Sequence, residues 1–384
     1  MSDRKQPPKV AIVYHFFAHY RGSVVEALLA SPNFDYTFYG ARTDPRNIGV
    51  EAYRIRPDRF VETYCRIFKG AILYQSKLIG LALNPKYKHI IFLGDAQYPC
   101  TWIAAPLSRL MGKHVLFWTI GWMRYDTGKK RLVRNTFYKL AHRLLLYGRY
   151  AREIGIKQGF DPDKLHVVYN SLDYDAQRAL RLAVNHDDLT RQREALFGDP
   201  NARYFICVSR LEKHRQIDWV MQAMKIAQDQ GHAFHLLLVG KGKEEEALRA
   251  LAAELGISVN FYGACYDENV LAQLFMASTA SVAPGMVGLL AMHSLGYGVP
   301  VVTHGDRDNQ APEWEAMVPG VSGVTFEFGN IESLSQALVA VSDLGKDDPN
   351  FRETCAIPME RFYNAHHQVD VIERALNKQP PFDE

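Results

Sequence analysis

Cysteine is scarce in this sequence, and its spacing argues against several kinds of site. The five cysteines, Cys65, Cys100, Cys207, Cys265 and Cys355, are scattered and form no Cys-x-x-Cys pair. Zinc centres and disulfide-stapled domains usually depend on such closely spaced pairs. The sequence therefore favours neither, and the scattered cysteines fit a reducing cytoplasm.

Long apolar runs, a strong excess of one charge and internal repeats are also absent. No apolar stretch approaches the roughly 20 residues of a membrane span. The polar start, MSDRKQPPKV, has no apolar core, so we expect no signal peptide. The 45 basic residues nearly balance the 42 acidic ones, so we do not expect the whole surface to bind polyanions.

What the sequence does contain is a recurring order of apolar strand, polar or glycine-rich loop, and helix. Such an order indicates parallel sheets in α/β proteins, and 384 residues suffice for two doubly wound domains. The loop at 170–173 is the predicted domain boundary, and residues 61–84 are predicted to be helical. We predict strands at 9–14, 36–39, 89–93, 114–118, 144–147, 166–169, 204–209, 235–239, 259–262 and 281–283.

Polar loops follow the predicted strands of the first half, where carboxyl ends of parallel strands often meet ligands. We take several of their residues as candidates for binding or orienting a second substrate, although a simply solvated loop would have the same composition. The candidates are His15, His19, Arg21 and Gly22 after the first strand, and Asp95 and Tyr98 after the third.

The segment 124–157 is strongly basic, and only Asp126 and Glu153 oppose its ten lysines and arginines. Leu132, Val133 and Phe137 begin an apolar stripe at helical spacing. A basic amphipathic helix can lie on an anionic membrane surface, whereas the same pattern also suits a solvated face over a domain core. Nucleic acid is disfavoured as a partner, because aromatic residues do not alternate with the charges.

Residues 281–302 read as strand, glycine turn, helix, glycine stop and strand. A glycine turn before a helix directs unpaired N–H groups at one point, which suits phosphates or sugar hydroxyls; the alternative is an ordinary βαβ unit with tight packing. Arg210 and Arg215 follow a strand end, and the arginine fork fits phosphate oxygens. The pair Gly240 and Gly242 is a weaker signal, because the full GxGxxG spacing is absent.

At Arg210-Leu211, the VGKG turn and PGMVGLLAMHSLGYGVPVV, the sequence resembles the family-4 group of retaining glycosyltransferases, which have the GT-B fold. The resemblance covers nearly the whole chain and is stronger in the second half. It implies two Rossmann-like domains that face each other across a cleft. It also implies an acceptor-binding domain at 1–170, a nucleotide-sugar-binding domain at 171–355, and terminal helices at 356–384 that cross back to the first domain.

The resemblance implies roles for individual residues of the second half. Arg210 and Arg215 would grip the donor diphosphate and stabilise the leaving group. Gly288 and Leu289 would present N–H groups to the donor sugar. The set of candidate donor-binding residues is Gly240, Gly242, Gly285, Met286, Val287, Gly288, Leu289, His293 and Glu313.

The sequence departs from the family's Glu-x7-Glu motif, whose two positions fall on Gly285 and His293. An imidazole reads ribose hydroxyls differently from a carboxylate, so we expect His293 to favour a donor that lacks one hydroxyl, such as a deoxythymidine diphosphate sugar. The family's histidine in the third loop of the first domain is replaced by Ile120, between Trp118 and Trp122. These two tryptophans are therefore candidates for stacking on an acceptor sugar.

The predicted activity is transfer of a hexosyl or deoxyhexosyl group from a nucleotide-sugar co-substrate to a glycan or lipid-linked acceptor, with retention and without a metal or other cofactor. Asp306-Arg307-Asp308 is the nearest Asp-x-Asp sequence, but it lies past the donor helix, and we expect it to form a solvated loop. Two alternatives remain: a sugar-nucleotide epimerase of GT-B-like fold, and a non-catalytic nucleotide-sugar-binding protein. The expected location is the cytoplasm, with peripheral contact to the inner face of the plasma membrane through residues 124–157.

Overall fold

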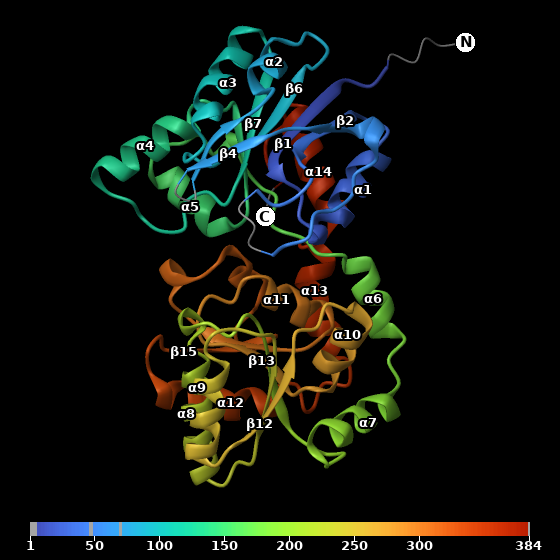
Figure 1. The fold of residues 1–384 in the computed structure, drawn as a ribbon, viewed down its shortest axis with the longest axis vertical. Helices are drawn as coiled ribbons and strands as arrows, with labels where there is room; N and C mark the ends of the chain where they lie inside the picture. Colours follow the sequence, from blue (N-terminus) through green and yellow to red (C-terminus); the bar gives the residue numbers. More distant parts are fainter. Residues whose placement is uncertain (1–5, 46–48, 69–70, 383–384) are drawn as a thin grey trace. The chain divides into compact units, whose positions relative to one another are not determined.

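The computed structural model describes residues 6–45, 49–68 and 71–382. The chain forms two compact units, Met1–Asp173 with Asn364–Glu384, and Tyr174–Tyr363 (Figure 1). The first crossing lies three residues after the predicted boundary at 170. The second crossing lies at residue 363 rather than 355, so the segment 356–384 is divided between the two units.

The first unit contains a parallel sheet of seven strands in the order β3-β2-β1-β6-β7-β8-β9. Every residue of the interior strand β7, His114–Thr119, is buried, as expected for a strand covered by helices on both faces. The remaining strands are β1 Lys9–Phe16, β2 Asp35–Ala41, β3 Phe60–Glu62, β6 His89–Leu93, β8 Arg143–Leu146 and β9 Leu165–Val167. The helices of this unit are α1 Gly22–Ala30, α2 Leu78–Leu83, α3 Pro99–Leu110, α4 Gly128–Tyr138, α5 Arg149–Lys157 and α14 Ala365–Leu376.

The prediction of a helix over 61–84 is wrong. The segment contains the end of β3, then an antiparallel hairpin of β4 (Cys65–Phe68) and β5 (Ala71–Gln75), and only then the short helix α2. The pairing is closed by the Ser76 amide, which donates to the Tyr64 carbonyl at 2.9 Å. Apolar runs rich in aromatic and β-branched residues are ambiguous between helix and strand, and here cross-strand pairing decides. Residues 69–70 of the predicted helix lie outside the described residues.

The second unit contains a parallel sheet of six strands in the order β12-β11-β10-β13-β14-β15. Helices α8 and α12 pack against each other over a core formed with β10, β11, β13 and β14. The strands are β10 Tyr204–Val208, β11 His235–Val239, β12 Ser258–Gly263, β13 Ala280–Ala283, β14 Val301–His304 and β15 Gly323–Phe326. The helices are α6 Tyr174–Leu182, α7 His186–Phe197, α8 Ile217–Asp229, α9 Glu245–Leu255, α10 Glu268–Ala277, α11 Leu289–Gly296, α12 Ile331–Asp343 and α13 Phe351–Arg361.

The last helix, α14, is part of the first unit, where Figure 1 shows it in red near the blue α1. Ala365, Val371 and Ile372 join the core beneath β1 and β2. The Gln368 side chain donates to the Tyr169 carbonyl at 2.9 Å and accepts from the Ser171 hydroxyl at 2.6 Å. Helix α13, in contrast, belongs to the second unit.

None of the helices in the described part of the chain combines the length and the apolar character that a membrane span requires.

Histidines line the amino-terminal edge of the first sheet, and they provide a test of its stability. Burial lowers the pKa of His89 to about 4 and those of His114 and His166 to about 3, with Lys378 and Arg143 adding repulsion. Because these values lie below the unfolded value near 6.5, the unfolded chain binds more protons once the pH falls below that value. The contribution of these histidines to the free energy of unfolding is therefore at its maximum above about pH 7, and it is lost as the pH falls toward 3.

We expect the free energy of unfolding to fall between pH 7.5 and pH 5, by about 2 kcal/mol each for His114 and His166, in urea titrations. His166→Gln should reduce this difference, because glutamine does not titrate. Exposed His186 at the start of α7 provides the control, and His186→Gln should leave the difference unchanged. Equal stability at the two pH values would contradict the prediction.

Candidate functional site

The loop that follows β10 carries both predicted phosphate-binding arginines. It runs beside the loop after β11: the Ser209 amide donates to the Val239 carbonyl at 3.0 Å, and the Leu211 amide donates to the Lys241 carbonyl at 3.1 Å. These bonds extend the pairing of two parallel strands beyond their carboxyl ends. The position of Arg210 is therefore fixed by the main chain on both sides.

Gly240 and Gly242 have a structural reason that the sequence did not reveal. A Cβ on Gly240 would overlap the carbonyl of Ser209, and a Cβ on Gly242 would overlap that of Leu211. Gly240 also has a φ of 145°, which other residues rarely adopt. These two glycines let the two loops touch, and this is how they contribute to the site.

The two arginines differ in environment. The Arg210 side chain is 61% exposed and lies 3.7 Å from a carboxylate oxygen of Glu212. The Arg215 Nε is buried and has no hydrogen-bond partner among the described residues. A buried, unsatisfied guanidinium N–H is costly unless an anion or water satisfies it. Arg215 therefore has unused capacity for a ligand.

The thiol of Cys207 lies at the end of β10, in the same region, but it is not suited to act as a nucleophile. Burial raises its pKa to about 11, despite the opposing influence of Ser209 and Arg215. At neutral pH it is therefore a thiol rather than the reactive thiolate.

The glycine turn after β13 meets the Arg215 loop directly. A Cβ on Gly285 would lie 3.2 Å from the His214 carbonyl oxygen, tighter than ordinary contact. The Val287 amide donates to the Gln310 side-chain oxygen at 3.0 Å, and the Gln310 amide group donates to Thr303 Oγ1 at 2.8 Å. The strand-end loops of β10, β11, β13 and β14 are thus joined at one edge of the sheet.

Gly288 ends this turn with φ 51° and ψ −144°, a conformation suited to glycine alone. Helix α11 begins at the next residue, Leu289, with no side-chain cap on its first turn. Met286, in the same turn, is 44% exposed. The amino end of α11 therefore leaves backbone N–H groups for a ligand beside the two arginines.

His293 lies on α11 itself, and Glu313 lies on a neighbouring element that packs against this helix. Glu313 is buried in a short 3₁₀ helix, Pro312–Ala316, that packs against α11. His293 Nδ1 lies 3.4 Å from Gln177 Nε2 on α6 and 3.9 Å from a Glu268 oxygen on α10. The ring thus faces α6 and α10, and its predicted contact with ribose stays a prediction.

The sequence reasoning missed three side chains of this region. Gln310 follows β14 by six residues, so its position past a strand end was a usable signal. Gln177 and Glu268 lie on helices far away in sequence, and no local pattern connects them with His293.

The Asp306 side chain accepts from the Asp308 amide at 3.1 Å as the cap of a short 3₁₀ helix. Among the described residues, no three metal-binding side chains gather.

In the first unit, Arg21 is buried in an aromatic box rather than displayed in a loop. Its guanidinium donates to the Tyr147 hydroxyl and lies over the rings of Tyr14 at 4.8 Å and Trp118 at 5.4 Å. Gly22 is needed because a Cβ would lie 2.7 Å from the ring of Tyr53. Both residues therefore fix the start of α1, and their predicted contact with an acceptor stays a prediction.

The prediction that Trp118 and Trp122 stack on an acceptor sugar is wrong in this structure. Trp118 is 2% exposed and Trp122 is 1% exposed, because both pack into the cores on the two faces of the sheet. The Trp122 Nε1 donates to Asn135 Oδ1 at 3.0 Å. Both large rings are buried in the cores, so neither forms a binding surface at the strand ends. Ile120, which lies between them in the sequence, is the exposed residue, at 44%.

The remaining acceptor-side candidates are spread over the same edge of the first sheet. His19 is exposed, whereas Tyr98 is 4% exposed and lies 6.1 Å from the ring of His15. Asp95 lines a cavity of about 590 Å³ together with Ile120 and residues of α4. Of these candidates, Asp95 is the one that lines this cavity.

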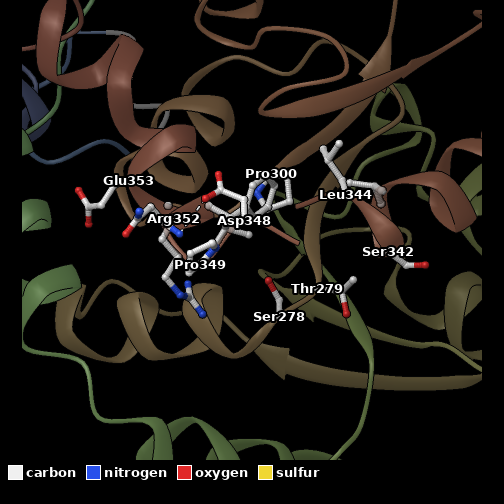
Figure 2. Close-up of a pocket in the computed structure, with 14 residues that line it drawn as sticks. Ser278, Thr279, Pro300, Ser342, Leu344, Asp348, Pro349, Arg352 and Glu353 are labelled. Carbon is white, nitrogen blue, oxygen red and sulfur yellow. Dashed lines mark hydrogen bonds between the residues drawn. The ribbon is translucent and has the colours of Figure 1, made fainter. Parts of the chain in front are cut away.

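A second cavity, of about 470 Å³, lies at the opposite edge of the second sheet, where β13 and β14 begin (Figure 2). Ser278, Thr279, Pro300 and Arg352 are among its lining residues. The Arg352 guanidinium donates to the Met276 carbonyl at the end of α10, at 2.6 Å. None of the predicted donor or acceptor residues lines this cavity.

Residues 202–343 match the family model described as "Glycosyl transferases group 1". This match contains the loops of β10, β11 and β13 and all of α11. No curated protein sequence matches the chain.

Several solved structures share the fold over nearly the whole chain. The lipopolysaccharide outer core galactosyltransferase WaaB aligns at 15% identity and a TM-score of 0.66, covering 96% of this chain and 99% of that one. Alr3699/HepE from Anabaena, solved in complex with UDP, aligns at 15% identity and 0.68 with the same coverage. A glycosyltransferase from Rickettsia africae aligns at 13% identity and 0.71, covering 97% and 99%. The fold, two Rossmann-like units with parallel sheets, is that of GT-B glycosyltransferases.

Proposed function

We propose that the protein transfers a hexosyl or deoxyhexosyl group from a nucleoside-diphosphate sugar to a glycan or lipid-linked acceptor. The observation that carries this proposal is the convergence of Arg210, Arg215 and the uncapped start of α11 at one sheet edge. The match of residues 202–343 to group 1 glycosyltransferases supports the reaction class. The UDP complex of the HepE structure supports a nucleotide-sugar donor by analogy.

The chemistry of these groups suits departure of a nucleoside diphosphate. Negative charge develops on the leaving phosphate, and two guanidinium groups with helix-end N–H groups stabilise it. We propose that this arrangement works without a metal. We also propose the retaining outcome and membership of the family-4 group with an altered motif, on the resemblance of the sequence. The residues with a proposed catalytic role are Arg210 and Arg215, and no covalent nucleophile is assigned.

Two other functions fit parts of the site. A sugar-nucleotide epimerase would turn over the donor with no second substrate. A non-catalytic binding protein would bind the nucleotide and turn nothing over, and Gly285 and His293 at the motif positions favour it. The presence of Arg210 and Arg215 beside the uncapped start of α11 favours a working donor site instead.

Thermal unfolding with UDP, GDP, dTDP, ADP and CMP tests the donor site. A nucleotide present at about 100 times its Kd adds roughly 2.7 kcal/mol, which raises the Tm by several degrees. We expect one diphosphate to stand out and its effect to disappear in Arg210→Ala. A larger effect of dTDP than of UDP would agree with the proposed role of His293.

Exposed Arg191 on α7 provides the control, and Arg191→Ala should respond like the wild type. Absence of any response at millimolar concentration would refute the donor site. With a responding nucleotide in hand, its sugar conjugate separates the functions: donor turnover without acceptor indicates the epimerase, and binding without any turnover indicates the binding protein.

We further propose that the protein works in the cytoplasm in bacterial polysaccharide or glycoconjugate synthesis, peripherally at the inner face of the plasma membrane. The structure alters the argument for the membrane. Residues 124–157 form α4, β8 and α5, and Phe137 is buried. Leu132 and Val133 are 68% and 51% exposed beside the lysines of α4, so α4 alone would make this contact.

A further inference from the structure

The cavity of the first unit lies at the carboxyl ends of β6 and β7 and is closed on one side by α4. Its volume is about 590 Å³, enough for a sugar and one further group. Ile120, Met123 and Val133 supply apolar wall, and Asp95 is the carboxylate among the lining residues. Four cations complete the lining: Arg124, Lys129, Lys130 and Arg134.

The charges of this cavity are unbalanced. Arg134 pairs with Asp126 at 2.5 Å, and the Asp126 side chain is 9% exposed, so this pair is a fixed part of the wall. Arg124, Lys129 and Lys130 have no carboxylate partner in the described parts of the chain. Three free cations and one carboxylate around a cavity give it a net positive potential, which attracts anions from solution.

We propose that this cavity binds the acceptor and that the acceptor carries a phosphate or diphosphate group. This inference rests on the proposed transfer reaction and specifies the acceptor class for it. Arg124, Lys129 and Lys130 bind the phosphate oxygens. Asp95 accepts a hydrogen bond from a sugar hydroxyl, as carboxylates in sugar sites can.

The apolar surface beside the cations helps to distinguish a lipid-linked phosphate from a soluble sugar phosphate as the acceptor. Ile120, Leu132 and Val133 are 44%, 68% and 51% exposed around the same cations. A lipid-linked phosphate would place its first apolar groups against this surface, whereas a soluble sugar phosphate would leave it in water. Both sources share the phosphate chemistry, and the experiment separates them.

The test measures direct binding of citronellyl diphosphate, inorganic pyrophosphate and citronellol by calorimetry, with the nucleotide identified by thermal unfolding present at saturation. Saturation keeps the probes from the donor site. We expect citronellyl diphosphate to bind, and Lys129→Gln/Lys130→Gln to weaken it by about tenfold or more, since two charge-assisted contacts are lost. Binding should also weaken as salt is raised.

Lys86→Gln/Lys88→Gln is the matched control, because it removes the same charge from exposed lysines just before β6, at the opposite end of that strand from Asp95. It should leave binding unchanged. Equal affinity for pyrophosphate and citronellyl diphosphate indicates a soluble phosphate, and a clear preference for the latter indicates a lipid-linked one; either supports the proposal.

Two results would overturn the proposal: no binding of either diphosphate, or equal loss in the Lys129/Lys130 and Lys86/Lys88 variants. Failure here leaves nucleotide binding intact, whereas failure of the proposed donor site removes the response to nucleotides. The two failures are therefore distinguishable in the same protein preparation.

Discussion

Arg215→Ala should reduce the rate of glycosyl transfer by about 10²- to 10³-fold. This is the usual effect of removing one hydrogen-bond donor that stabilises a developing negative charge. The same variant should lose most of its thermal stabilisation by the nucleoside diphosphate. Its stability without ligand should stay unchanged, because the Arg215 Nε has no hydrogen-bond partner among the described residues and the substitution leaves no orphaned acceptor for it. Initial rates and Tm values with and without nucleotide measure all three effects.

Two companion variants sharpen this prediction. Arg215→Lys keeps the charge but lacks the two-pronged geometry, so we expect an intermediate rate. Arg191→Ala removes an exposed arginine that pairs with Asp188, one helical turn away, and should not change the rate. If Arg215→Ala transfers sugar as fast as the wild type, Arg215 is not part of the catalytic site.

Gly242→Ala should destabilise the second unit by about 3 kcal/mol, the upper end of typical overpacking effects. The new methyl group would overlap the main-chain carbonyl of Leu211, which cannot rotate away as a side chain could. Any relief requires the loop after β10 to move, so we also expect weaker nucleotide binding. Urea unfolding and nucleotide titration of the same variant measure both effects.

Gly256→Ala provides a control in which the new methyl group meets no neighbouring atom. Gly256 has φ 62° at the end of α9, with open space where a Cβ would stand. An alanine there costs only the left-handed conformation, about 1 kcal/mol. Equal losses for Gly242→Ala and Gly256→Ala would mean that the close approach of the two loops does not matter.

The sequence predicted the second unit well because its signals are local. Buried strands such as 204–209 and 235–239 have apolar runs, and glycines mark the turns that follow 235–239 and 281–283. The same logic located Arg210, Arg215 and the start of α11 at strand ends, since parallel strands bring their carboxyl ends to one edge. It could not reveal why Gly240 and Gly242 are glycine, because their neighbours come from another loop.

The first unit was predicted less well, because its secondary structure and the exposure of its side chains depend on contacts between distant parts of the chain. The residues 61–84 have a composition that suits either a helix or a hairpin, and only pairing with a partner strand decides. Trp118 and Trp122 stand beside a predicted binding loop, yet packing on the two faces of the sheet hides both rings. Exposure of a side chain is a property of the whole fold, so single positions near a loop carry little information about it.

The return of α14 to the first unit has a consequence for synthesis on the ribosome. Residues 174–363 are an uninterrupted stretch of chain, and this unit has all of its strands and helices once residue 363 has emerged. The first unit starts earlier but waits longest, because Ala365, Val371, Ile372, Ala375 and Leu376 complete its core. The unit whose synthesis begins first is therefore the last to become complete. A stop codon a few residues before α14 would leave the apolar core of this unit exposed to solvent.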